Sequence, residues 1–113
     1  MQILKEIVTI DELKIMAEQF FGDLIKVVVD IEQKLIAIDA ELHSDLESLF
    51  LKNGSKQVNL WGINFYPYKE KEDFIEFDSM INLRPSQGNR SRGVDSKEIQ
   101  SLIIDIVDKW VKT

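Results

Sequence analysis

Residues 24–40 read LIKVVVDIEQKLIAIDA, and the architecture expected for this 113-residue chain depends on whether they form strands or a helix. The segment is dense in valine and isoleucine, whose branched side chains favour strands because they pack well on a pleated surface. A polar pair, Glu32 and Gln33, interrupts it near the middle, so it predicts two strands joined by a hairpin turn. A single helix is the main alternative, but the successive valines at 27–29 are poor helix formers and Gly22 precedes them.

The residues before this hairpin predict one strand and one helix. Ile3–Val8 is a short apolar segment that we interpret as a strand. Thr9 is a natural N-cap for the helix that follows, and Glu12 completes a capping box with it. Apolar residues then recur at helical spacing until Gly22, which supplies a stop.

A short helix and a second hairpin are expected after the first hairpin. Ser44 and Glu47 repeat the capping-box spacing, and Asn53-Gly54 ends this helix. Val58–Tyr66 and Phe74–Arg84 are alternating apolar and polar runs joined by the charged loop PYKEKED, so they predict two paired strands.

The last helix completes the expected architecture. Asp95 is its expected N-cap, Glu98 holds the capping-box position, and apolar residues recur at helical spacing as far as Trp110. Strands joined by short turns pair antiparallel, so we expect a mainly antiparallel sheet of about five strands, built from two hairpins. We expect the three helices to pack on one face of it, which gives a single α+β domain over residues 1–113.

Composition and charge restrict the classes of function. The net charge of −6 disfavours non-specific nucleic-acid binding, because such binding depends on neutralising phosphates with lysine and arginine. The absence of cysteine excludes a disulfide framework and a cysteine-ligated zinc site, and it is compatible with a reducing cytosol. No apolar run is long enough to span a membrane, and the N-terminus lacks the pattern of a signal peptide. We therefore expect a cytoplasmic protein that does not insert into a membrane.

All three arginines of the chain lie in one stretch, RPSQGNRSRGVD, which begins at residue 84. Residues 84–94 contain no acidic residue and carry three positive charges, so the remainder of the chain has a net charge of −9. Arginine pairs bidentately with phosphate or carboxylate, and the glycines of this stretch let the backbone approach a ligand closely. The stretch also leads into a helix N-terminus, where an anion is favoured, although Asp95 competes for the same donors. We call residues 84–93 the Arg loop, and it predicts an anion-binding site formed by Arg84, Ser86, Gln87, Asn89, Arg90, Ser91, Arg92 and Gly93.

A loop without a ligand remains the alternative. The Arg loop matches neither the P-loop pattern nor the GxGxxG pattern of phosphate sites. Its arginines can equally pair with the protein's own carboxylates, such as Glu76 and Asp78, or be solvated. In that case the loop is structural.

Two further groups of polar residues could carry chemistry. Asp39, Glu41 and His43 fall at two-residue spacing, so on a strand they would share one face and could hold a divalent metal. The chain has no second histidine, and a polar strand end leading into a helix explains the same residues. The outward face of the second hairpin carries the other group, which forms either a polar floor beside the Arg loop or a solvated sheet face: Asn64, Glu76, Asp78, Asn82 and Arg84.

Three stretches carry a family resemblance: ELHSD at 41–45, NGSKQVNLWGIN at 53–64 and EFDSMINLRPSQGNRSRGV at 76–94. Through them the chain resembles, over essentially its whole length, a family of small prokaryotic proteins known only as a domain of unknown function. The resemblance implies a small, free-standing cytoplasmic protein. It implies no activity, substrate or cofactor, and it assigns no role to any residue.

Three functions are compatible with these patterns. A binding module would hold a phosphate-bearing small ligand, or an acidic protein partner, through the Arg loop. An enzyme would use the same loop as a substrate clamp, with Glu76, Asp78 or the group at residues 39, 41 and 43 supplying acid–base or metal chemistry. A homo-oligomer would dock the Arg loop of one subunit on the acidic surface of another. We favour the binding module because no nucleophile–base pair or metal motif stands out, and the sequence identifies no cofactor.

Overall fold

The valine-rich segment forms the centre of the sheet, as its composition predicts. The computed structural model describes residues 1–113, and in it β3 (Ile25–Asp30) and β4 (Leu35–Ile38) form an antiparallel hairpin. The side chain of Asp30 accepts hydrogen bonds from two backbone N–H groups of the turn, which fixes the turn conformation. The hairpin interpretation is therefore confirmed.

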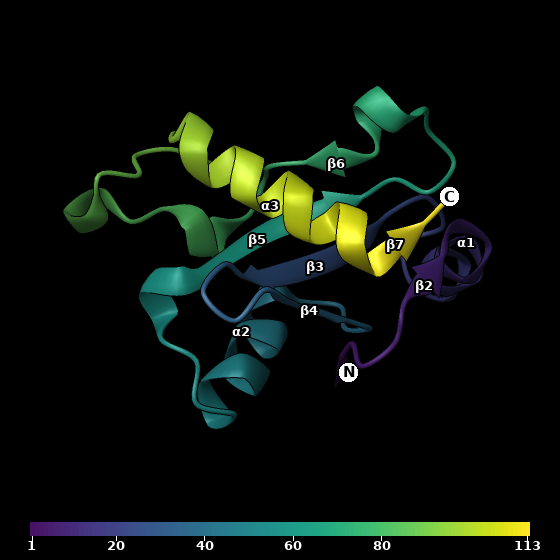
Figure 1. Cartoon of the computed structure of the whole chain (residues 1–113), viewed down its shortest axis with the longest axis horizontal. Helices are drawn as coiled ribbons and strands as arrows, with labels where there is room; N and C mark the ends of the chain where they lie inside the picture. Colours follow the sequence, from purple (N-terminus) through teal and green to yellow (C-terminus); the bar gives the residue numbers. More distant parts are fainter.

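Five strands form the sheet, in the order β1–β4–β3–β5–β6, and all neighbouring strands are antiparallel. β5 (Leu60–Phe65) pairs with β3 along its whole length, whereas the edge strands β1 (Gln2–Ile3) and β6 (Ile75–Glu76) have two residues each. Figure 1 shows α3 lying across the front of this sheet. The structure is a single α+β domain with a mainly antiparallel sheet, in agreement with the prediction.

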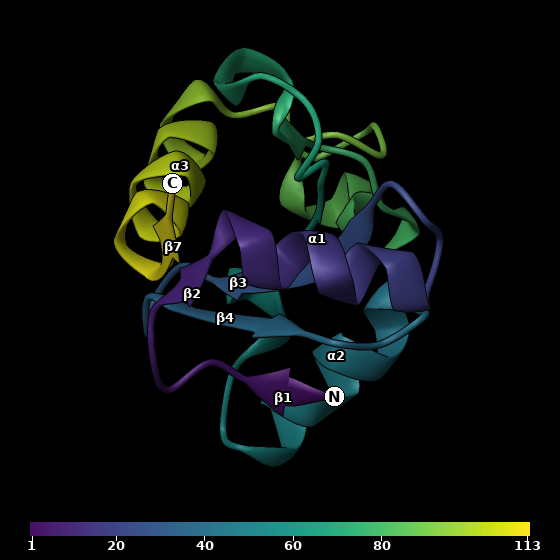
Figure 2. The same ribbon diagram turned by 90° about the vertical axis from the view of Figure 1, so that its right-hand side faces the viewer.

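The three helices cover both faces of the sheet, so the prediction that they share one face is wrong. α1 (Ile10–Gln19) and α3 (Lys97–Trp110) pack against the larger core, which includes Val27, while α2 (His43–Lys52) packs against Val28 on the opposite face. Figure 2 shows α1 and α2 on opposite sides of β3 and β4. The successive valines of β3 are all fully buried, so this strand presents apolar surface on both faces and needs cover on both.

The N-terminal segment forms two short strands instead of the single strand expected at Ile3–Val8. β1 pairs with β4, and β2 (Val8–Thr9) pairs in parallel with β7 (Val111–Lys112), as Figure 1 shows near the C-terminus. Lys5 and Glu6 are exposed between the two strands, where the chain leaves the edge of the main sheet. The apolar pattern of an isolated segment does not reveal that its two ends pair with different strands.

The second hairpin is shorter than the expected strand at Phe74–Arg84, because the chain leaves the sheet after Glu76. A 3-10 turn at Met80–Asn82 follows. The carboxamide of Asn82 pairs with the backbone of Gly62 in β5, accepting from its N–H at 2.8 Å and donating to its C=O at 2.8 Å. The Asn82 side chain therefore satisfies the backbone N–H and C=O of Gly62. A longer β6 would otherwise have to satisfy these groups.

The helix starts agree with the sequence at α1 and differ at the other two helices. The Thr9 capping box of α1 is present, with both reciprocal hydrogen bonds. α2 begins at His43 without a side-chain cap, so the expected N-cap at Ser44 is wrong. α3 is capped by Ser96 instead of Asp95, because the Asp95 carboxylate accepts hydrogen bonds from the Arg loop.

Candidate functional site

The Arg loop does not present all of its arginines to solvent. Arg84 is 8% exposed, and its guanidinium donates hydrogen bonds to the backbone carbonyls of Ile81 and Leu60 and to Gln87 Oε1. The guanidinium carbon also lies 4.8 Å from the centre of the Trp61 ring. Burial lowers the pKa of Arg84. Arg84 therefore fastens the loop to β5, and the protein itself occupies its donors.

Asn89 holds the rest of the Arg loop together. It is 4% exposed, its Nδ2 donates to three backbone carbonyls, including that of Gly93, and its Oδ1 accepts from the N–H of Asp95. The hydroxyl of Ser91 and the N–H of Arg90 both donate to the Asp95 carboxylate and lower its pKa. These bonds are internal to the loop, so they fix its backbone and leave few donors for a ligand.

The remaining side chains of the loop are exposed. Ser86, Gln87 and Arg90 are exposed, whereas Arg92 lines a cavity on the α2 face of the sheet. Its Nε donates to Asp78 Oδ1 at 2.8 Å, in an ion pair whose side chains are 55% and 42% exposed. The other N–H donors of the Arg92 guanidinium have no partner in the protein, so they are available to a ligand.

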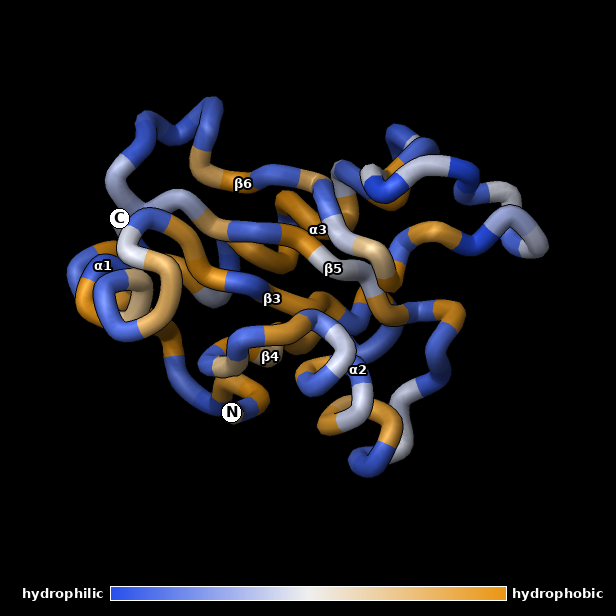
Figure 3. The backbone as a smooth tube through the Cα atoms, turned by 180° about the vertical axis from the view of Figure 1, so that it is seen from behind, coloured by the Kyte–Doolittle hydropathy of each residue, from blue (hydrophilic) through white to orange (hydrophobic).

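We call the cavity beside Arg92 the polar pocket. It has a volume of about 430 Å³, and the N-terminus of α2 forms part of its wall. Figure 3 looks onto this face and shows no helix in front of β5 and β6. Lys26, Asn64 and Glu76 occupy neighbouring positions on β3, β5 and β6, so their side chains share the face. The polar residues that line the pocket are Lys26, His43, Ser44, Asn64, Tyr66, Glu76, Asp78, Ser79 and Arg92.

Asn64 has an unsatisfied acceptor in the polar pocket. The residue is 6% exposed, and its Nδ2 donates to Glu76 Oε1 at 2.9 Å and to the backbone carbonyl of Asp78 at 3.2 Å. Because both partners are acceptors, they fix which end of the amide faces them. The Oδ1 atom at the other end is buried and receives no hydrogen bond.

His43 also brings an acceptor to the polar pocket. It is 9% exposed, and its Nε2 lies 2.8 Å from the carbonyl oxygen of Ile63, so Nε2 carries the hydrogen and Nδ1 has the lone pair. Burial lowers the pKa of His43; the Ile63 carbonyl raises it, and the charges of Lys26 and Arg92 lower it further. His43 is therefore neutral at neutral pH. Nδ1 has no hydrogen bond within the protein and is not sealed from solvent.

The charges around the polar pocket balance. Lys26 and Arg92 are its cations, and Glu76 and Asp78 are its anions. Both carboxylates are already partly occupied, because Asp78 pairs with Arg92 while Glu76 accepts from Asn64 and from the Tyr66 hydroxyl at 3.0 Å. This hydrogen bond contributes to raising the pKa of Tyr66, after the larger effect of burial. The pocket therefore offers both donors and acceptors to a small polar molecule.

The N-terminus of α2 adds further donors. Leu42 is the N-cap residue, and no side chain caps the helix. Leu42, His43 and Ser44 all line the polar pocket. Because the first backbone N–H groups of a helix have no intrahelical partner, this end of α2 favours a negatively charged group.

The expected metal group at Asp39, Glu41 and His43 does not form. Asp39 Oδ2 lies 3.1 Å from the N-terminal amine of Met1, whereas His43 turns toward β5. No group of three or more histidine, aspartate or glutamate side chains is placed to hold a metal. The three residues do not share a strand face because β4 ends at Ile38 and Asp39 turns the chain with a φ of 76°.

The polar floor expected on the second hairpin forms only in part. Asn64, Glu76 and Asp78 meet in the polar pocket, while Asn82 and Arg84 bond to the backbone of β5. The sequence reasoning missed Lys26, for which the local signal is a single charge within the apolar segment LIKVVV. It also missed the placement of His43 beside β5, for which the sequence gives no local signal because it depends on how α2 packs.

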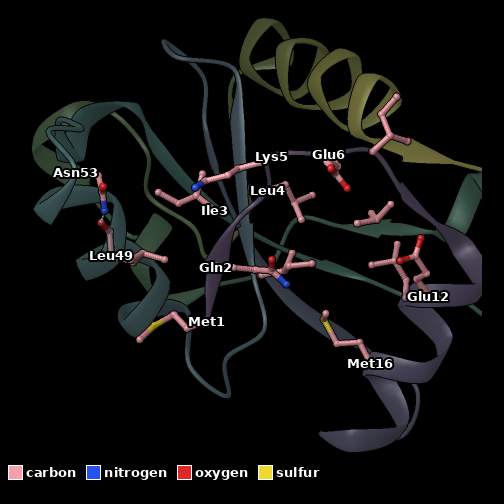
Figure 4. A pocket seen from close by; sticks show the side chains of 14 residues that line it. Met1, Gln2, Ile3, Leu4, Lys5, Glu6, Glu12, Met16, Leu49 and Asn53 are labelled. Atoms are coloured by element: carbon pink, nitrogen blue, oxygen red, sulfur yellow. Dashed lines mark hydrogen bonds between the residues drawn. The ribbon is translucent and has the colours of Figure 1, made fainter.

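Three other cavities are larger than the polar pocket. One, of about 680 Å³, lies between the N-terminal segment, α1 and α2, and Figure 4 shows its polar side chains, such as Lys5, Glu6 and Asn53, spread apart. Another, of about 700 Å³, lies between α3 and residues 67–77, and its lining combines apolar residues such as Phe74 with charged ones such as Lys69 and Glu72. The third, of about 480 Å³, lies between residues 3–5, Leu35, Phe50 and Trp110. The polar pocket is the candidate site because its lining includes the unsatisfied Oδ1 of Asn64 and the free donors of Arg92.

The fold and the pocket define a small α+β protein with a polar cavity on the α2 face of an antiparallel sheet. The chain belongs to the family described as "Protein of unknown function (DUF5674)", whose model matches residues 2–110. No curated protein and no solved structure matches the chain. None of its helices has the length and apolar character needed to cross a membrane.

Proposed function

We propose that the protein is a binding module that holds a small, phosphate-bearing ligand in the polar pocket. The observation that carries this proposal is the convergence of Lys26, Arg92 and the uncapped N-terminus of α2 on one cavity of about 430 Å³. That volume lies within the range of small-molecule sites, which is roughly 300–1,000 Å³. The proposal keeps the anion binding expected of the Arg loop but moves its centre to the pocket, with Arg92 as the shared residue.

The hydrogen-bond donors of the polar pocket suit a phosphate group. Asp78 occupies only Nε of Arg92, so the terminal guanidinium nitrogens can pair with two phosphate oxygens. Lys26 adds a flexible ammonium group, and the first turn of α2 adds backbone N–H groups and a favourable dipole. Together these groups supply the charge-assisted donors that an anion needs.

An enzyme that acts on the same ligand is the second candidate. The neutral imidazole of His43 favours it, because its Nδ1 has no partner within the protein and can accept a proton, and the carboxylates of Glu76 and Asp78 line the same cavity. Four further expectations stay predictions from composition and resemblance. They are an acidic protein partner, self-association, a cytoplasmic location and a prokaryotic origin.

A thermal-shift screen against nucleoside monophosphates, hexose phosphates and glycerol phosphate tests the proposal. A ligand at 100 times its dissociation constant stabilises the folded state by about 2.7 kcal/mol. We expect a stabilising compound whose effect is lost in Arg92→Ala and in Lys26→Ala. Arg90→Ala is the matched control, because Arg90 is exposed and does not line the pocket, and it should keep the effect. Absence of any stabilising compound, or a shift that Arg92→Ala preserves, contradicts the proposal.

A further inference from the structure

We infer that the ligand of the polar pocket carries hydroxyl or amine donors next to its phosphate, and that His43 Nδ1 and Asn64 Oδ1 accept hydrogen bonds from them. The class of ligand is thus a polyol or amino-alcohol phosphate, as opposed to inorganic phosphate or a simple alkyl phosphate. This inference rests on the proposed function, because it concerns the chemistry of the part of the ligand that lies beyond the phosphate.

His43 supplies the first acceptor. Its ring is 9% exposed, and the hydrogen bond to the Ile63 carbonyl requires the hydrogen on Nε2. Nδ1 therefore presents a lone pair, and it has no partner within the protein. Because the bond to Ile63 holds the ring against β5, His43 cannot turn to offer a donor without breaking a buried hydrogen bond. An acceptor held in this way selects a donor on the ligand.

Asn64 supplies the second acceptor, at the adjacent position of β5. Both hydrogen bonds of its Nδ2 go to acceptors, so the amide cannot be reversed to turn a donor outward. Its Oδ1 is sealed from solvent, and a ligand donor reaches it only when a side chain on the pocket wall moves.

The pocket therefore presents hydrogen-bond donors and acceptors side by side. Lys26, Arg92 and the first turn of α2 offer donors, while His43, Asn64 and the carboxylate of Glu76 offer acceptors. A phosphate dianion has only acceptors and satisfies the first set alone. Hydroxyl or amine groups a few bonds away satisfy the second set, and a site with unpaired buried acceptors rejects an analogue that lacks those donors.

Glycerol phosphate and propyl phosphate test this inference as a matched pair. They have the same charge and the same carbon chain, and they differ in the hydroxyl groups. Isothermal titration calorimetry on the wild-type protein should show that glycerol phosphate binds at least about tenfold more tightly, by the selectivity that unpaired polar groups impose. Equal affinities would show that the phosphate is recognised and the donors are not, which overturns the inference and leaves the proposed function intact. Binding of neither compound, nor of any nucleotide or hexose phosphate, overturns both.

Nitrogen NMR of the imidazole gives a direct second readout. The chain has one histidine, so its ring signals are assigned without ambiguity. Glycerol phosphate should shift the Nδ1 resonance toward that of a hydrogen-bonded nitrogen, and propyl phosphate should leave it in place. His43→Asn should reduce the preference for glycerol phosphate to less than about threefold, by the same selectivity argument. An Nδ1 resonance unchanged by glycerol phosphate contradicts the inference, and this wild-type measurement decides even if His43→Asn fails to fold.

Discussion

Arg84 and Arg92 belong to one loop, but their surroundings give them different roles. Arg84 is buried, donates to two backbone carbonyls and stacks on Trp61, so it stabilises the fold. Arg92 is half exposed, forms a single ion pair with Asp78 and keeps donors free toward the polar pocket. Surface ion pairs contribute little to stability, so the effect of losing Arg92 should appear in binding rather than in folding.

Replacing Arg84 should therefore destabilise the protein more than replacing the other arginines. We predict that Arg84→Ala lowers the free energy of unfolding by about 3 kcal/mol, because charged hydrogen bonds are lost and buried carbonyls lose their donor. Arg90→Ala, at an exposed position, should change it by less than about 0.5 kcal/mol. Urea denaturation of the two variants measures the difference. Equal stabilities would show that the buried contacts of Arg84 are not structural.

The lowered pKa of His43 predicts a pH dependence of stability. In the unfolded chain His43 titrates near its ordinary pKa of 6.5, whereas in the folded protein burial disfavours the proton. Below that pH the unfolded state takes up the proton first, so stability falls as the pH decreases and is unaffected by His43 at higher pH. Urea midpoints at about pH 5.5 and about pH 7.5 should differ more for the wild type than for His43→Asn. The same pH dependence in both proteins would refute this account of His43.

Which arginine is buried could not be predicted at the residue scale. The clustering of the arginines and their proximity to carboxylates are visible in the sequence, and the pair of Arg92 with Asp78 is one of the pairings it allows. The burial of Arg84 depends on the carbonyl of Leu60 and the ring of Trp61, which come from a distant strand. No local pattern encodes such a contact.

At the scale of elements, the junction between β5 and the turn at Met80–Asn82 decides the shape of the second hairpin. Residues 77–83 place Phe77, Ile81 and Leu83 at alternate positions and so resemble a strand with one apolar face. Asn82, however, bonds to the backbone of Gly62 through its side chain. The bare backbone of Gly62 lets the turn approach β5 closely. Side-chain alternation alone therefore could not show where the strand ends.

Gly62→Ala should disrupt this junction. A Cβ at position 62 would lie 2.5 Å from Ser79 Cβ and Oγ and 3.1 Å from Ile81 Cγ1, so the turn would have to move away from β5. We predict a loss of about 2 kcal/mol in the free energy of unfolding, as expected for overpacking at a rigid site. Adding Ser79→Gly removes the clashing atoms and should recover part of that loss in chemical denaturation. A Gly62→Ala protein as stable as the wild type would show that the turn can move away from β5 without a loss in the free energy of unfolding.

At the scale of the whole molecule, the sequence predicts the α+β class, the central hairpin and three helices, because these depend on local periodicity and capping. The sequence pattern alone does not predict that helices cover both faces of the sheet. The three successive buried valines of β3 are nevertheless consistent only with a strand that is covered on both sides. The polar pocket forms where the cover on the α2 face ends, and residues from β3, α2, β5, β6 and the Arg loop meet there. Its composition therefore depends on tertiary packing.

The most direct test of the account is a heteronuclear NMR titration of the wild-type protein with glycerol phosphate. The account predicts that backbone shifts concentrate on the residues around the polar pocket, namely Lys26, His43, Ser44, Asn64, Glu76 and Arg92. Residues 86–90 of the Arg loop should change little. Shifts centred on residues 86–90 would show that the ligand binds at the Arg loop and not in the polar pocket. Shifts at neither place, up to millimolar ligand, would contradict the claim that this pocket binds a phosphate-bearing molecule.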